Sequence, residues 1–296
     1  MTEELQLPEP PVFSDEQIRR CRESGSFMPV MYEWYKYVCR LCILFASISR
    51  ESPAVRDLPA IQYSVITGLL NRCSRLMLAN LALARNGRFG ETTALLDRCI
   101  FETCVKAMWL CHKGTEDAFS RYLADGLRTE IELSAEIQEN ISKREGNPVL
   151  AIEDRMLKSI KRHIALAGLT EEEVIATKRF PNMAVMMHDL GIERLWYVVG
   201  QRIGSHHIHG TWPSLLTHYL EEEDGSLLLR DNDCSTHPNQ FVAIALLVLS
   251  AIAASIRFTF SSKEDISPLK DFLESIEVEI LKVAHVMAKG DFDAVS

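Results

Sequence analysis

The strongest constraint on the fold is a run of 16 uncharged residues near the C-terminal end of the chain. Residues 241–256 read FVAIALLVLSAIAASI, and Arg257 follows directly. Because a bilayer-spanning helix needs roughly 20 apolar residues, this run is short for a membrane span. Alanine and serine recur through it, as they do in a helix that is packed on all sides. We therefore expect a central core helix over 239–260 and no membrane partner.

Helical periodicity fills most of the remaining sequence, whereas strand patterns are almost absent. We expect further helices over residues 28–50, 59–86, 91–112, 115–143, 151–167, 192–209 and 267–289. Thr115 is the expected N-cap of the fourth of these, because its hydroxyl can accept a bond from a free backbone N–H. A short strand at Leu227–Leu229 is the most β structure that the pattern supports. The sequence predicts an all-α fold, a single multi-helix bundle with at most one very short strand or hairpin.

Length and charge bound the organisation of the chain. The 296 residues suffice for one large domain, expected over 28–290 after a flexible, acidic and proline-rich tail over 1–27. This tail lacks the basic start and apolar run of a secretory signal. A net charge of −9 argues against a broad nucleic-acid surface, although a small local site for RNA is compatible with it. Most of the eight cysteines stand among apolar helical residues, which favours a reduced, cytoplasmic protein.

The candidate functional segment is GQRIGSHHIHGTW, residues 200–212, which holds three of the nine histidines. In a regular helix, four of its polar side chains share one face: that of Arg202 and three others within about 60° of it. These four are Arg202, Ser205, His206 and His209. His207 points about 140° away from Arg202 on the same wheel. The pattern therefore predicts one polar stripe of an arginine, a serine and two histidines.

Two chemistries are compatible with this stripe. A zinc site needs three or four ligands, and only His206 and His209 are offered at helical spacing, so we expect no metal and no other cofactor. Catalysis suits the stripe better. The permanent charge of Arg202 can hold a phosphate and stabilise the transition state of its transfer, while His209 titrates near neutrality and can move the proton. RNA cleavage needs little more, because the ribose 2′-OH supplies the nucleophile.

A second pair, Arg98 and Glu102, lies on an apolar helix at a spacing of four residues. Such pairs are commonly solvated and contribute roughly 0.3–0.5 kcal/mol. A buried pair, by contrast, needs further polar partners or it lowers stability. Ser205 and His209 could be those partners, which would create one polar cluster inside the bundle. The cluster could be structural or catalytic, and the sequence leaves both alternatives open.

These residues carry a resemblance to a known superfamily. RIGSHHIHG fits the R-x(4–6)-H signature of the HEPN superfamily (higher eukaryote and prokaryote nucleotide-binding domains) twice, from Arg202 to His207 and to His209. The surroundings resemble a bacterial helical family labelled only as a domain of unknown function. Its pattern is an arginine and a glutamate four apart, then a tyrosine, then S-x-x-x-H-G. This sequence matches it with Arg98, Glu102, Tyr197, Ser205, His209 and Gly210, within a resemblance over about 60–260.

The resemblance implies a HEPN-like bundle that forms a homodimer and cleaves RNA without a metal ion, as a toxin or a phage-defence effector. Arg202 and His209 would be catalytic with His206 and Ser205, supported by four further residues: Arg98, Glu102, His207 and Tyr197. The partners implied are a second copy, RNA, and a protein such as an antitoxin. The alternative is a non-catalytic helical interaction or sensor module of the same fold, in which the polar cluster only fixes helix packing.

Overall fold

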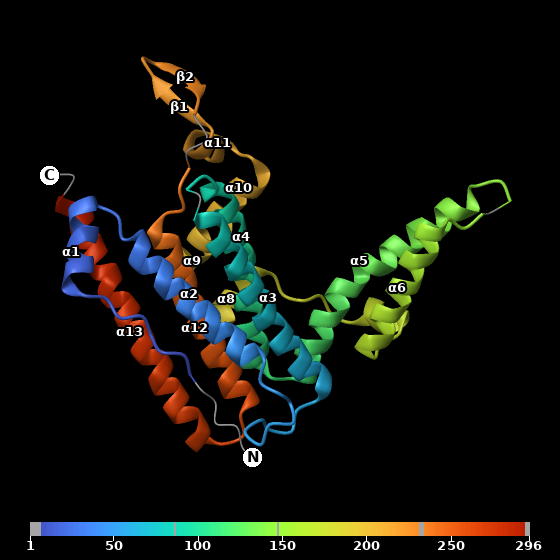
Figure 1. Ribbon diagram of the computed structural model, residues 1–296. Coiled ribbons are helices and arrows are strands. Elements are labelled where there is room, and N and C mark those ends of the chain that lie inside the picture. Colours follow the sequence, from blue (N-terminus) through green and yellow to red (C-terminus); the bar gives the residue numbers. More distant parts are fainter. Residues whose placement is uncertain (1–6, 86, 147, 231–233, 294–296) are drawn as a thin grey trace. The chain divides into compact units, whose positions relative to one another are not determined.

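The computed structural model describes residues 7–85, 87–146, 148–230 and 234–293 (Figure 1). Its contacts divide the chain into two compact units. Unit 1 combines Met1–His112 with Met183–Ser296, and unit 2 is Lys113–Asn182. The single domain expected over 28–290 is thus interrupted by a second unit, because the helices of 113–182 pack mainly on one another.

The described part of unit 1 is mainly helical and carries one hairpin, which agrees with the expected all-α fold. Its helices are α1 (Asp15–Ser24), α2 (Met28–Ala46), α3 (Ala60–Ala84), α4 (Gly90–Lys113), α8 (Met183–Asp189), α9 (Arg194–Tyr197), the π-helix η1 (Val198–Ile203), α10 (Gly204–His209), α11 (Trp212–His218), α12 (Pro238–Thr259) and α13 (Lys263–Asp293). The hairpin pairs β1 (Leu220–Glu223) with β2 (Ser226–Leu229) in antiparallel register. The short strand expected at 227–229 is therefore confirmed as one half of this hairpin.

Helix α12 is the apolar helix that the uncharged run predicted, and it packs against α2, α3 and α13 (Figure 1). The ring of Phe241 stacks on that of Tyr35 in α2 with 4.3 Å between the centroids. Among the described residues α12 is the one helix long and apolar enough to cross a membrane, and 56% of its most apolar window is buried inside the protein. Length and composition alone do not distinguish a span from a core helix, so the expected absence of a membrane partner stays a prediction.

Helices α3 and α4 are joined by polar contacts inside the core of unit 1. Nδ2 of Asn80 donates to Oδ1 of Asp97 at 2.6 Å and to the hydroxyl of Tyr35 at 3.1 Å. The other carboxylate oxygen of Asp97, Oδ2, is sealed from solvent and has no hydrogen-bond partner among the described residues. Burial raises the pKa of Asp97 to about 8, and the bond from Asn80 opposes that shift. Asp97 directly precedes Arg98, so this buried cluster and the candidate site share one turn of α4.

The N-terminal segment differs from the expected tail. Residues 15–24 form α1, because Ser14 and Gln17 make a capping box in which each side chain bonds the backbone of the other. Pro8 is also fixed, since its carbonyl accepts a 2.9 Å bond from the hydroxyl of Tyr37. The tail over 1–27 is therefore corrected from residue 7 onward, and residues 1–6 lie outside the described ranges.

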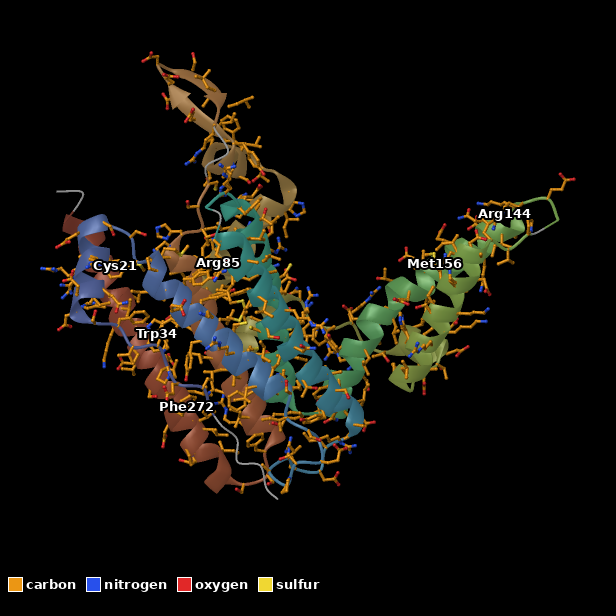
Figure 2. All side chains as sticks on the ribbon, in the orientation of Figure 1. Cys21, Trp34, Arg85, Arg144, Met156 and Phe272 are labelled. Atoms are coloured by element: carbon orange, nitrogen blue, oxygen red, sulfur yellow. The ribbon has the colours of Figure 1, made fainter. Side chains whose placement is uncertain are left out.

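Unit 2 consists of α5 (Glu116–Ser142), α6 (Ala151–Ala167) and α7 (Glu171–Ala176). The predicted cap is confirmed, because Oγ1 of Thr115 accepts a 3.3 Å bond from the N–H of Ala118. The three helices share a small apolar core of Ala124, Leu127, Ile160, Ile164 and Val174. Arg144 lies near the turn between α5 and α6 (Figure 2), where Nη2 bonds both carboxylate oxygens of Glu153.

Candidate functional site

Helix α4 supplies the first part of the site, the pair Arg98 and Glu102. The Nε of Arg98 donates to Oε1 of Glu102 at 3.1 Å. The side chains are 14% and 30% exposed, so this is a largely buried ion pair and not the solvated pair that the spacing alone would suggest. Such a pair requires further hydrogen bonds to satisfy its remaining donors and acceptors.

Ser205 of α10 supplies one of these bonds. Nη1 of Arg98 donates to Oγ of Ser205 at 2.6 Å, and the same hydroxyl donates to the carbonyl of Gln201 at 3.1 Å. The serine hydroxyl thus both accepts and donates a hydrogen bond, and its proton points to the carbonyl of Gln201. The structure brings Arg98, Glu102 and Ser205 into one cluster, as the sequence had suggested. His209, the other suggested partner, is exposed and lies outside that cluster.

Two glycines allow this segment to approach α4 closely. A Cβ at Gly200 would lie 2.4–2.8 Å from three atoms of the Phe101 ring, a separation that side chains do not tolerate. A Cβ at Gly204 would lie 3.2–3.5 Å from three side-chain carbons of Arg98. The sequence GQRIG therefore places a small residue at each point where the segment meets α4.

The helix expected over 192–209 is not regular. It is divided into α9, the π-helix η1 and α10, so the wheel drawn from Arg202 does not hold across it. A π-helix forms i to i+5 bonds and turns the following side chains to a new direction, and such turns are frequent at functional sites. The predicted stripe is corrected accordingly: Ser205 contacts Arg98, whereas Arg202 is exposed on the π-helix.

The predicted histidines have three different surroundings. Nδ1 of His206 lies 2.7 Å from Oγ1 of Thr211. A proton transfer by His206 would therefore use its other ring nitrogen, Nε2. His209 is exposed at the end of α10, where Gly210 terminates the helix with a positive φ of 55°. His207 belongs to a second polar cluster. Tyr197, also expected in the site, is partly buried at the end of α9.

This second cluster comprises Glu91, His207, Ser214, His218 and Cys234. The hydroxyl of Ser214 donates to Oε1 of Glu91 at 3.4 Å and lies 3.4 Å from Nδ1 of His207. Since Glu91 can only accept, His207 fits as the tautomer that carries its proton on Nδ1. The rings of His207 and His218 meet edge to face at 4.9 Å.

Cys234 closes the second cluster. Its Sγ lies 2.9 Å from Nδ1 of His218, while Nε2 of His218 is buried without a hydrogen-bond partner among the described residues. Burial lowers the pKa of His218 below its ordinary value, and neighbouring His207 and Arg230 add to that shift. Burial also lowers the pKa of His207, opposed by Glu91. Both imidazoles are therefore biased toward the neutral form.

Sequence reasoning missed four members of this cluster: Glu91, Ser214, His218 and Cys234. Cys234 and His218 are 16 positions apart on either side of the hairpin, and no spacing rule connects them. Glu91 could have been suspected, because it shares a helix face with Arg98 and Glu102. Over the residues that the structure describes, no three histidine, cysteine or acidic side chains are arranged to hold a metal ion.

Exposed apolar side chains recur over residues 195–219, the segment that also carries Arg202 and His209. They are Leu195, Trp196, Val199, Ile203, Ile208, Trp212, Leu215, Leu216 and Tyr219, each at least 36% exposed. Monomeric proteins seldom present so many large apolar groups within one short segment unless the surface binds something. We call this set the apolar face of α9–α11.

The comparisons with known proteins bear on the same segment. No curated protein and no solved structure matches the chain. A family of unknown function, DUF5677, matches residues 63–227, which is more than half of the chain and includes Arg98, Glu102 and Ser205. The expected relation to a domain-of-unknown-function family is thereby confirmed, and the HEPN relation remains a proposal. The chain belongs to the family of unknown function DUF5677.

Proposed function

We propose that the protein is a HEPN-like ribonuclease that cleaves RNA without a metal ion. The observation that carries the proposal is the exposure of both Arg202 and His209 beside the buried Arg98–Glu102–Ser205 cluster. A catalytic arginine and histidine must reach a phosphate in solvent, whereas residues of a purely structural clasp would be sealed. The buried cluster fixes the position of α10, on which His209 stands.

The proposed reaction is a transesterification within the RNA strand. The 2′-oxygen attacks the adjacent phosphorus and forms a 2′,3′-cyclic phosphate, and the bond to the 5′-oxygen of the next nucleotide breaks. His209 takes up the 2′-OH proton or delivers a proton to the leaving 5′-oxygen, with His206 as the second candidate for that transfer, and water exchanges the other proton. The Arg202 guanidinium stabilises the additional negative charge on the phosphate oxygens.

Exposed aromatic rings support an RNA substrate. Trp196, Trp212 and Tyr219 are 50%, 55% and 45% exposed, in the same part of the sequence as Arg202 and His209. Single-stranded RNA is commonly bound through bases that stack on aromatic side chains while cations contact its backbone. This arrangement provides local binding despite the net negative charge of the chain.

A second copy of the chain is the proposed partner for the aliphatic side chains of the apolar face of α9–α11, while its three aromatic rings are left to RNA. In a symmetric dimer the same surface meets itself, so each site would face a second Arg202 and a second His209. A cytoplasmic location is proposed as well, and it is supported by the state of the eight cysteines, all of which are free thiols. A toxin or phage-defence role follows from the resemblance alone.

The apolar face also favours the second candidate function, a non-catalytic interaction or sensor module. In that case the face would bind a partner protein, and the Arg98–Glu102–Ser205 cluster would only hold α10 against α4. The two functions differ in what Arg202 and His209 do, because the module needs neither for chemistry.

The test is cleavage of a mixed RNA pool in EDTA by the purified protein. Arg202→Ala and His209→Ala are compared with Arg155→Ala and His188→Ala, exposed residues whose positions fall outside residues 200–212. We expect 2′,3′-cyclic phosphate ends from the wild type and both controls, and loss of cleavage in the first two variants. Absence of cleavage by a folded wild-type protein, or cleavage that survives both changes, would contradict the proposal and favour the interaction module.

A further inference from the structure

Unit 2 contains an open pocket of about 480 Å³ between α5 and the segment that follows α7. Ligand pockets in proteins commonly range over roughly 300–1,000 Å³, so this one could hold a small molecule. Its lining includes Arg128, Ile131 and Glu132 from α5, and Ile175 and Arg179 from the other side. Two arginines and two isoleucines around one pocket suggest a ligand that has both an anionic and an apolar part.

Arg128 is the buried cation of this pocket. Its side chain is 13% exposed, and Nη2 donates to the carbonyl of Thr177, which holds the guanidinium in place. Nη1 is sealed from solvent and forms no hydrogen bond with any described residue, although Oδ1 of Asp125 lies 3.7 Å away. Buried N–H donors are nearly always satisfied in folded proteins, and a charged donor without an acceptor is costly. The guanidinium is held between the carbonyl of Thr177 and the carboxylate of Asp125, and the side chain lines the pocket.

Arg179 provides a second cation at the pocket. The side chain is exposed, while the backbone carbonyl accepts bonds from Nε and Nη2 of Arg121 at 3.0 and 2.7 Å. The segment over 177–179 is thus fastened to α5 at two carbonyls, by Arg128 and by Arg121. A fixed backbone limits where the Arg179 guanidinium can reach, and both arginines line the same pocket.

The remaining lining restricts the ligand further. Ile175 is 67% exposed and offers apolar surface next to the cations. The carboxylate of Glu132 also lines the pocket, and with Asp125 near Arg128 the local charge is close to balanced. A polyanion such as a triphosphate or a nucleic-acid strand would be repelled by these carboxylates. One anionic group attached to an apolar body fits better.

We propose that this pocket binds a small organic phosphate, with the phosphate between Arg128 and Arg179 and the apolar body against Ile131 and Ile175. Planar guanidinium groups match phosphate oxygens in pairs, and a phosphate offers enough oxygens for two arginines at once. A carboxylate shares this chemistry but has only two oxygens. The site lies wholly within unit 2 and does not depend on the proposed ribonuclease activity.

The experiment is calorimetric titration of the full chain with phenyl phosphate, inorganic phosphate and benzoate. Arg179→Gln is the main variant, because Arg179 is exposed and its carbonyl, not its side chain, bonds Arg121. Lys178→Gln is the matched control, since Lys178 is the adjacent exposed cation and does not line the pocket. Arg128→Gln is the second variant, accompanied by a thermal melt because its side chain also holds Thr177.

We expect phenyl phosphate to bind more tightly than inorganic phosphate or benzoate. Arg179→Gln should weaken that binding roughly tenfold or more, as loss of a hydrogen bond to a charged group does, and Lys178→Gln should leave it unchanged. Lack of phenyl phosphate binding at millimolar concentration would overturn the proposal. Equal binding by wild type and Arg179→Gln would overturn it too, because the ligand would then occupy another place. Benzoate that binds as tightly as phenyl phosphate would overturn the assignment to phosphate.

Discussion

Nη1 of Arg98 donates a 2.6 Å hydrogen bond to Oγ of Ser205, across 107 positions of the chain. This bond joins α4 to α10 and gives a largely buried guanidinium an acceptor in addition to Glu102. It also links two parts of the sequence that lie far apart in the chain, the arginine–glutamate pair and the S-x-x-x-H-G segment. Removal of the Ser205 hydroxyl therefore tests how much this bond stabilises the protein.

Ser205→Ala should lower the free energy of unfolding by about 1–3 kcal/mol, because it leaves a buried, charged N–H of Arg98 without its acceptor. Urea denaturation followed by circular dichroism measures the change. Ser275→Ala is the control, since Ser275 is exposed on α13 and bonds only the carbonyl of Phe272 in its own helix. Equal effects of the two substitutions would show that the Arg98–Ser205 bond adds little to stability.

Gly200→Ala should destabilise the protein by about 1–3 kcal/mol, because the added Cβ would overlap the ring of Phe101. Gly68→Ala should have the opposite sign and stabilise α3 by roughly 0.5–1 kcal/mol, since nothing lies within 4 Å of its added Cβ. Thermal melts of the two variants provide the comparison. If both substitutions stabilise the protein, η1 does not approach α4 as closely as the structure places it.

Asp97 should make stability depend on pH. Its pKa is raised to about 8 in the folded state against an ordinary value of 3.8, so the folded protein retains a proton that the unfolded chain releases. The contribution of Asp97 to the free energy of unfolding is then fully present below about pH 4. It falls as the pH rises toward 8, with a slope of at most ~1.4 kcal/mol per pH unit. Asp97→Asn should flatten this decline because the amide cannot ionise.

Urea denaturation at pH 5 and pH 8 measures the effect of Asp97, and Asp271→Asn is the control because Asp271 is exposed on α13. From pH 5 to pH 8 we expect the free energy of unfolding to fall less in the Asp97→Asn variant than in the wild type. The Asp271→Asn variant should show the same fall as the wild type. A gain of the same size in both variants would argue against a buried, protonated Asp97.

Cys234 should be the first thiol to react with iodoacetamide in the folded protein. The neighbouring Nδ1 of His218 can accept its proton at 2.9 Å, whereas burial raises the pKa of Cys39 to about 11 and that of Cys111 to about 12. Mass spectrometry of peptides after short exposure gives the order of labelling. His218→Asn should slow the labelling of Cys234 and leave that of Cys99 unchanged. Labelling of Cys99 before Cys234 would contradict the proposed role of His218.

Local sequence determined most of the helices. The uncharged run over 241–256 required a helix, and Thr115 placed the start of α5, because both depend on neighbours within one or two turns. Helix α1 was also open to prediction from Ser14 and Gln17, whose spacing is that of a capping box. The proline-rich sequence before them led instead to an expected tail.

Tertiary structure decided the site. The helical wheel drawn for residues 202–209 assumed a regular helix. The π-helix η1 instead turns His207 toward Ser214 and His218, and it brings Ser205 into contact with Arg98. No local preference specifies the partner of Arg98, and packing of the segment through Gly200 and Gly204 selects it. The cluster of His218 and Cys234 depends likewise on the hairpin that brings its two ends together. Helices follow from hydrogen bonds between near neighbours, but polar clusters follow from which helices pack, and that is fixed by burial over the whole chain.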